Sequence, residues 1–161
     1  MINYLKENPI DFSGLRILEL GCGWGLIGVY LAKNYSCEVT CTDIDHKVLP
    51  IVDMHASLNK VLVHTKKASF CDLSQKELEN FDILIGAEIC YDDEVADQIL
   101  ELSKRAFVAD VKKILIVDPG RPDFKHLSTR CVALFQSKTL QLPGSVNGKT
   151  TNLLTLQKFI H

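Results

Sequence analysis

The stretch Glu19-Leu20-Gly21-Cys22-Gly23-Trp24-Gly25-Leu26-Ile27-Gly28 decides how this chain folds. A short apolar run over residues 15–20 leads into it, and apolar residues recur at helical spacing from Gly25 to Lys33. Glycines between a buried strand and a helix allow a tight turn and a close approach of the backbone to a ligand. The helix that follows offers unpaired N–H groups to a carboxylate or a phosphate. The stretch therefore predicts a strand, a ligand-binding turn and a helix in direct succession.

The same alternation of strands and helices continues along the chain. Strands are predicted over residues 15–20, 38–43, 63–69, 81–87 and 114–117, and a closing hairpin over 139–142 and 153–159 with a long loop at 143–148. Helices are predicted over residues 25–33, 48–58, 92–108 and 124–135. Repeated units of this kind place parallel strands between helices. We therefore expect one α/β domain over residues 1–161, a doubly wound and mostly parallel seven-stranded sheet with an antiparallel C-terminal strand.

The composition excludes several classes of protein. The chain has 161 residues, 47% of them hydrophobic, and a formal net charge of −2, which gives no basic field for nucleic acid. It contains no apolar run of transmembrane length and no signal-peptide pattern at the N-terminus, so no membrane partner is expected. The six cysteines form no CxxC pair, which favours reduced thiols and a cytoplasmic location. The histidines have no metal-ligand spacing, and no metal site is expected.

Two ligand chemistries compete at the glycine loop. The spacing Gly23-x-Gly25-x-x-Gly28 fits a dinucleotide fingerprint, but Glu19 at the strand end would repel a pyrophosphate. A carboxylate there suits a cation instead, such as the amino group or the sulfonium of S-adenosylmethionine. Asp43, at the end of the second strand, can accept hydrogen bonds from two ribose hydroxyls, which both cofactors carry. A third interpretation is a purely structural turn in which Glu19 is a solvated strand end.

The pattern Glu19-x-Gly21-x-Gly23-x-Gly25 resembles the first motif of class I, seven-stranded S-adenosylmethionine-dependent methyltransferases. The order of elements resembles their fold over nearly the whole chain. This resemblance implies that Glu19 and the loop hold the methionine end of the cofactor, and that Asp43 holds the ribose. It implies that Asp72 meets the adenine amino group, although Asp72 fits a helix N-cap or a loop acid equally well. The cofactor-binding residues implied in this way are Glu19, Gly21, Cys22, Gly23, Trp24, Gly25, Asp43, Ile44, Asp72 and Glu88.

A second motif follows the fourth predicted strand. Glu88-Ile89-Cys90-Tyr91 resembles the acid-x-x-aromatic motif of the methyltransferase family 16 group, which holds protein-lysine and nicotinamide N-methyltransferase-like members. The segment Asp118-Pro119-Gly120-Arg121, which predicts a type II turn, resembles bacterial members of that group. Methyl transfer requires an uncharged amine aimed at the sulfonium, so the resemblance implies catalytic roles for Glu88 and Tyr91. Alternatively, Glu88 simply ends a strand and Tyr91 belongs to the core. Cys22 and Cys90 are expected to line the cofactor crevice.

We therefore expect an S-adenosylmethionine-dependent N-methyltransferase whose acceptor is a protein lysine or another amine. Only about a dozen residues precede the first predicted strand, where the group usually carries a longer region that closes over the cofactor. The chain is thus a short member or a truncated one. The alternative is a cofactor-binding module, inactive alone, that needs a partner chain or an oligomer to complete the site. A dinucleotide-binding oxidoreductase fragment is a third hypothesis, disfavoured by Glu19. The sequence leaves the identity of the acceptor open.

Overall fold

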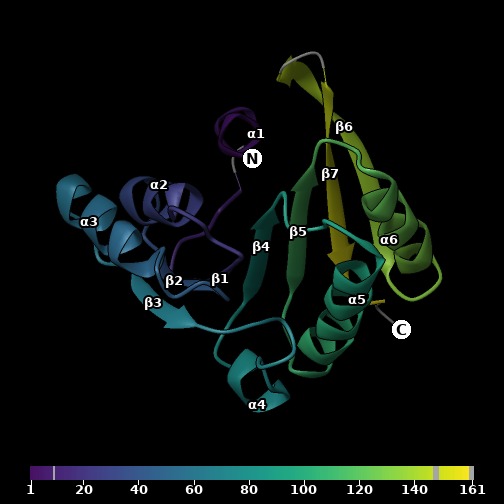
Figure 1. The fold of residues 1–161 in the computed structure, drawn as a ribbon, viewed down its shortest axis with the longest axis horizontal. Helices are drawn as coiled ribbons and strands as arrows, with labels where there is room; N and C mark the ends of the chain where they lie inside the picture. The colour runs from purple at the N-terminus through teal and green to yellow at the C-terminus, as the bar shows by residue number, and fades with distance from the viewer. Residues whose placement is uncertain (9, 147–148, 160–161) are drawn as a thin grey trace.

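The computed structural model describes residues 1–8, 10–146 and 149–159. Strands and helices alternate along these residues (Figure 1). The strands are β1 (Arg16–Leu20), β2 (Glu38–Asp43), β3 (His64–Lys67), β4 (Ile83–Ala87), β5 (Lys113–Asp118), β6 (Gln136–Val146) and β7 (Lys149–Gln157). The helices are α1 (Ile2–Glu7), α2 (Leu26–Asn34), α3 (Leu49–Asn59), α4 (Gln75–Leu78), α5 (Asp93–Val108) and α6 (Pro122–Val132).

The strands form one seven-stranded sheet in the order β3-β2-β1-β4-β5-β7-β6. The neighbours from β3 to β5 pair in parallel, and β7 is antiparallel to both β5 and β6. This arrangement confirms the predicted doubly wound sheet with an antiparallel C-terminal strand. The strand order reverses at β1, between β2 and β4, so the carboxyl ends of β1 and β4 adjoin the crevice where such sheets bind ligands.

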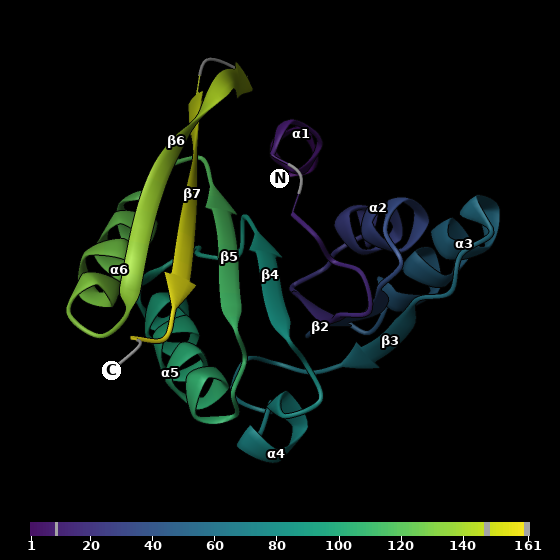
Figure 2. The ribbon, with the colours of Figure 1, turned by 180° about the vertical axis from the view of Figure 1, so that it is seen from behind.

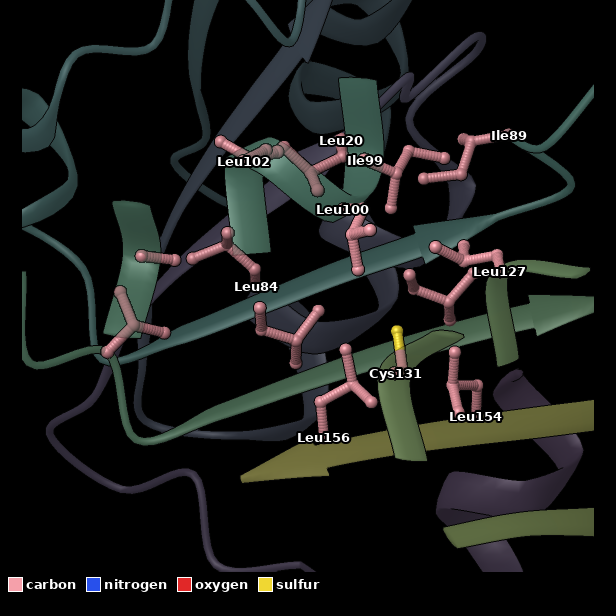
Figure 3. Packing of buried hydrophobic residues seen from close by; sticks show 14 of the residues in the cluster. Leu20, Leu84, Ile89, Ile99, Leu100, Leu102, Leu127, Cys131, Leu154 and Leu156 are labelled. Atoms are coloured by element: carbon pink, nitrogen blue, oxygen red, sulfur yellow. The ribbon is translucent and has the colours of Figure 1, made fainter. Parts of the chain in front are cut away.

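Helices cover the two faces of the sheet and enclose two hydrophobic cores. One core joins the α4, α5 and α6 side to the sheet, and Figure 3 shows part of it around Ile99, Leu127 and Leu154. The other joins α1, α2 and α3 to the opposite face, and Figure 2 shows these helices from behind. Successive strand residues point to opposite faces, so Ile17 enters the second core while Leu18 and Leu20 enter the first. Glu19 consequently faces α2.

The structure corrects two details of the predicted fold. The loop expected at 143–148 is wrong over residues 143–146, because β6 continues to Val146, and residues 147–148 lie outside the described residues. Pro143 is tolerated there because β6 is the edge strand and its pairing shifts in register between Gln141 and Ser145. The sequence analysis also missed α4, a four-residue helix in which Ser74 and Glu77 form a capping box.

Two further observations concern the molecule as a whole. None of the helices in the described ranges is long and apolar enough to cross a membrane. All six cysteines are free thiols.

Candidate functional site

The loop between β1 and α2 is shaped by glycines in the left-handed region of the backbone. Gly21, Gly23 and Gly25 have φ angles of 56°, 51° and 70°. A Cβ on Gly25 would lie 2.6 Å from Cγ1 of Val52, so α3 packs directly against this position. A Cβ on Gly23 would meet no atom within 4 Å. Gly23 therefore presents bare backbone to open space, whereas Gly25 is fixed by packing.

Glu19 lies beneath this loop and is 2% exposed. Its Oε2 accepts a hydrogen bond from the backbone N–H of Gly28 at 2.9 Å and one from the Cys41 thiol at 3.1 Å. Burial raises the pKa of Glu19 to about 7, although these hydrogen bonds oppose the shift. Its carboxyl therefore ties the first turn of α2 to β1 and β2, and it is not the solvated strand end considered from the sequence.

Asp43, at the carboxyl end of β2, braces the same loop from the side. Its Oδ2 accepts from the backbone N–H of Gly23 at 2.9 Å, and its Oδ1 accepts from the N–H of Asp45 at 2.9 Å. A carboxylate oxygen can accept two hydrogen bonds, so each oxygen keeps capacity for one more donor. The geometry thus leaves Asp43 able to take two hydroxyl groups while it holds the loop.

The segment after β4 alternates between anchored and exposed side chains. Ile89 and Cys90 are buried in the core on the α5 and α6 side, whereas Glu88 is 66% and Tyr91 65% exposed. Tyr91 is therefore not the core residue considered as an alternative. Glu88 has a φ of 57°, rare for a residue with a side chain, and its N–H donates to the carbonyl of Val117 at 2.7 Å. The backbone is held so that the Glu88 side chain leaves the sheet.

Arg121, which directly precedes α6, joins this segment to the end of β5. Its guanidinium pairs with Asp118 and with Glu88 and lies over the ring of Tyr91. At Asp118-Pro119-Gly120-Arg121 the chain bends, and Gly120 has the φ of 84° that a type II turn requires at its third position. The N–H groups of Gly120 and Arg121 both donate to Oδ1 of Asp118 at 2.8 Å. The resemblance had marked the Asp118–Arg121 segment, but the sequence analysis did not assign Arg121 to the site.

A cavity of about 780 Å³ opens at the carboxyl ends of β1, β4 and β5. Side chains from α1, the glycine loop and the β6–β7 hairpin line it, and Figure 2 shows α1 on this side of the molecule. Three carboxylates contribute to the lining: Glu7, Glu19 and Glu88. In the described part of the chain, no lysine or arginine side chain lines it. The exposed carboxylates of Glu7 and Glu88 favour a cationic occupant, and the amino group of Met1, which also lines the cavity, opposes them in part.

The cavity gathers part of the predicted site. Five predicted residues line it: Glu19, Gly21, Cys22, Trp24 and Glu88. Six do not: Gly23, Gly25, Asp43, Ile44, Asp72 and Tyr91. The residues of α1 and of the hairpin that complete the lining were missed, since nothing in their local sequence indicates that they meet the glycine loop.

The predicted cofactor residues outside the cavity lie on open surface or in the loop. The exposed carboxylate of Asp72 accepts from the N–H and the hydroxyl of Ser69, both at 2.8 Å, and these bonds lower its pKa. The N-cap of α4 is Ser74, so Asp72 is a loop acid and not a helix cap. Ile44 and the cavity-lining Trp24 are both exposed. Their contacts with a cofactor stay predictions.

One expectation about the crevice is wrong. Cys90 is fully buried in the core against α5 and α6 and does not line the cavity, whereas Cys22 does. Burial raises the pKa of the Cys90 thiol to about 12, so it stays protonated. In the ranges that the structure describes, no three His, Cys, Asp or Glu side chains are grouped to hold a metal ion.

Comparisons with known proteins place these features in a family. The chain matches the model of the lysine methyltransferase family over residues 1–124. It is 28% identical over 159 residues to the electron transfer flavoprotein beta subunit lysine methyltransferase of Mus musculus. The aligned region covers 94% of this chain and 58% of that protein. For the protein of that name from Xenopus laevis the identity is 30%, over 75% of this chain and 48% of that protein. The chain spans about half the length of the curated relatives it matches.

Solved structures agree with the sheet described above. A methyltransferase from Pyrococcus furiosus superposes with a TM-score of 0.75 at 18% identity, over 99% of this chain and 81% of that one. This likeness shows a Rossmann-like fold shared with methyltransferases. The family match covers most of the chain, from α1 to the start of α6. The chain belongs to the lysine methyltransferase family.

Proposed function

We propose that this chain is the catalytic domain of an S-adenosylmethionine-dependent N-methyltransferase whose acceptor is a protein lysine. Family membership supports the reaction class, and the relatives are named for lysine methylation of the electron transfer flavoprotein beta subunit. The observation that carries the proposal is the cavity at the carboxyl ends of the strands, which joins the glycine loop to Glu88 and is lined by carboxylates.

The residues fit the proposed cofactor. The open backbone at Gly23 provides a surface on which a ligand can lie, and Asp43 beside it keeps capacity for the two ribose hydroxyls. Glu19 lines the cavity below the loop, where we assign the methionine end. The cofactor supplies the methyl group on a sulfonium, and the protein's task is to hold donor and acceptor in line.

Glu88 and Tyr91 are proposed to act on the acceptor. A lysine ammonium must lose a proton before its nitrogen attacks the methyl carbon, and a nearby carboxylate can orient the amine by hydrogen bonding. The Glu88 side chain lines the same cavity as the glycine loop, together with Ala87 and Val117. The exposed ring of Tyr91 offers an aromatic face that attracts a cationic group.

Cofactor binding is tested by titration calorimetry with S-adenosylhomocysteine. Wild-type protein should bind in the micromolar range, about −8 kcal/mol, and Asp43→Ala should abolish binding. Asp45→Ala is the matched control, because this exposed acid is two residues away and should leave the affinity within about threefold. Equal affinities for wild type and Asp43→Ala would contradict the assigned ribose site.

Methyl transfer is tested with tritiated S-adenosylmethionine and the electron transfer flavoprotein beta subunit. Mass spectrometry should find methylated lysines in that subunit, and Glu88→Gln should lower the rate without loss of cofactor binding. Binding without transfer to this subunit or to a lysine peptide library would support the alternative, a module that needs a partner chain, an oligomer or a lid. Transfer to nucleic acid in place of protein would overturn the proposed acceptor.

A further inference from the structure

Arg121 gathers groups that are far apart in the sequence. Its Nη1 donates to Oδ2 of Asp118 at 2.9 Å, and its Nη2 donates to Oε2 of Glu88 at 3.3 Å. Its guanidinium carbon lies 5.3 Å from the centre of the Tyr91 ring, within the range of a cation–π contact. One side chain therefore contacts both residues that we assign to the acceptor.

Arg121 is itself firmly anchored through Asp118. That carboxylate is 0% exposed, and its second oxygen accepts the backbone N–H groups of Gly120 and Arg121. The side chain and the backbone of Arg121 are thus held by the same buried group at the end of β5. A planar guanidinium fork fixed at one end has little freedom to swing, so its other nitrogen lies at a defined place.

Glu88 and Tyr91 need such a partner because both side chains are exposed. The buried Ile89 and Cys90 fix the backbone between them but do not restrain their side-chain torsions. Among the described residues, Arg121 is the only arginine or lysine paired with Glu88. An exposed ion pair of this kind adds little to stability, so its consequence is mainly one of geometry.

We propose that Arg121 is a positioning residue, which holds the Glu88 carboxylate and the Tyr91 ring in the arrangement that receives the acceptor amine. The inference rests on the proposed function and deepens it. The guanidinium donates one hydrogen bond to Oε2 of Glu88, which leaves the carboxylate with acceptor capacity for the amine. Arg121 acts through Glu88 and Tyr91 and does not touch the reacting atoms.

The test must separate this role from simple compensation of the buried charge of Asp118. Arg121→Ala alone leaves that carboxylate without its counter-charge, which destabilises the end of β5. The double variant Arg121→Ala/Asp118→Asn removes the charge and keeps an oxygen for the N–H groups of Gly120 and Arg121. Asp118→Asn alone, with Arg121 still present, is compared with the double variant, so that the loss of the Asp118 charge is separated from the loss of Arg121. The matched control is Arg130→Ala, since Arg130 on α6 pairs with Asp97 on α5, away from the cavity.

Two readouts apply to each variant. The first is methyl transfer to the electron transfer flavoprotein beta subunit, as kcat and KM, beside the affinity for S-adenosylhomocysteine. The double variant should bind the cofactor product within about threefold of wild type and lose about tenfold or more in kcat, as expected when a group that orients the acceptor is lost. Adding Glu88→Gln should lower kcat by a much smaller factor in the double variant than in wild type. The effects on kcat of residues that act as a unit are not additive.

The second readout needs no turnover. Amide hydrogen exchange of residues 88–91 in the cofactor-free protein should be about tenfold faster in the double variant and unchanged in Arg130→Ala. Wild-type kcat and wild-type exchange in the double variant would overturn the inference and leave Arg121 a counter-charge for Asp118. If wild-type protein transfers no methyl group at all, the proposed function fails, and the exchange rates alone decide whether Arg121 orders the segment.

Discussion

The chain places one glutamate below the loop after β1 and another in the segment after β4, and both line the same cavity. The two side chains are held by different interactions. Glu19 is buried and accepts hydrogen bonds from the backbone N–H of Gly28 on α2 and from the thiol of Cys41 on β2. Glu88 is exposed and paired with Arg121, which lies 33 residues further along the chain. The first region is shaped by backbone and packing, and the second by one side chain anchored elsewhere.

This difference predicts different responses to substitution. Changes in the loop should alter stability and cofactor affinity together, because the loop is part of the packing between α2, α3 and the sheet. Changes in the segment after β4 should alter turnover while the fold is retained, because its exposed side chains contribute little to the core.

Gly25→Ala should have the largest effect on stability. The new Cβ would lie 2.6 Å from Val52, and the residue would keep a φ of 70° that disfavours a side chain. Overpacking costs about 1–3 kcal/mol and the left-handed backbone about 1–2 kcal/mol, so we expect a loss of about 2–5 kcal/mol. Urea unfolding measures this loss. A loss no greater than that of Gly23→Ala would show that α3 does not constrain the loop.

The second largest effect should be on the pH dependence of the unfolding free energy, to which Glu19 contributes. The pKa of Glu19 is about 7 in the folded protein against an ordinary 4.5, so the folded state binds the proton more tightly. The contribution of Glu19 to the unfolding free energy should therefore be complete below pH 4.5 and be lost as the pH rises to 7 and above. A shift of this size corresponds to a loss of up to about 3 kcal/mol.

Urea unfolding at intervals between pH 5 and pH 8, on the order of one unit apart, measures this slope in wild type, Glu19→Gln and Glu88→Gln. The fall with pH should disappear in Glu19→Gln, which keeps only the opposite slope of the Met1 amino group, whose pKa burial lowers, and it should persist in Glu88→Gln. The carboxyls of Glu77 and Asp82 have pKa values near 2, so they titrate outside this window. A wild-type slope retained in Glu19→Gln would assign the effect to another group.

Most of the fold could be predicted because its signals are local. The β-branched run at Glu38–Asp43 is a strand with the predicted bounds, and the helix predicted over 48–58 is α3, with Pro50 in its first turn. The hairpin loop was wrong because Pro143 and Gly144 normally break strands, and their tolerance in β6 depends on its place at the sheet edge. Edge position is a property of the whole sheet and cannot be read from a short window.

The candidate site divides in the same way. The glycine loop and Asp43 could be placed after the first and second strands from the sequence, whereas the hydrogen bond between the Gly23 N–H and Asp43 was not predicted. The hydrogen-bond partners of the Glu19 side chain could not be predicted from the sequence, because Gly28 and Cys41 belong to two elements that meet only in the folded sheet. Arg121 was missed as a partner of Glu88 for the same reason.

Gly23→Ala should lower the unfolding free energy less than Gly25→Ala does, and its main effect should be on the affinity for the cofactor. A Cβ there meets no atom within 4 Å, so only the backbone cost of about 1–2 kcal/mol applies. The methyl group would instead occupy the space where we place the ligand. Calorimetry with S-adenosylhomocysteine should show a loss of more than about tenfold, about 1.4 kcal/mol, beside this small loss of stability. Unchanged affinity would move the ligand away from this face of the loop.

Glu88→Gln should have the smallest effect on the fold. The side chain is largely exposed and its pair with Arg121 is at the surface, so the unfolding free energy should change by less than about 0.5 kcal/mol. Removing the charge should nonetheless lower kcat by about a hundredfold, which is typical of the loss of a general acid or base. Denaturation and steady-state kinetics on the same preparation give both values. A large loss of stability with little loss of kcat would reverse the contrast between the two glutamates, and the segment after β4 would then be structural.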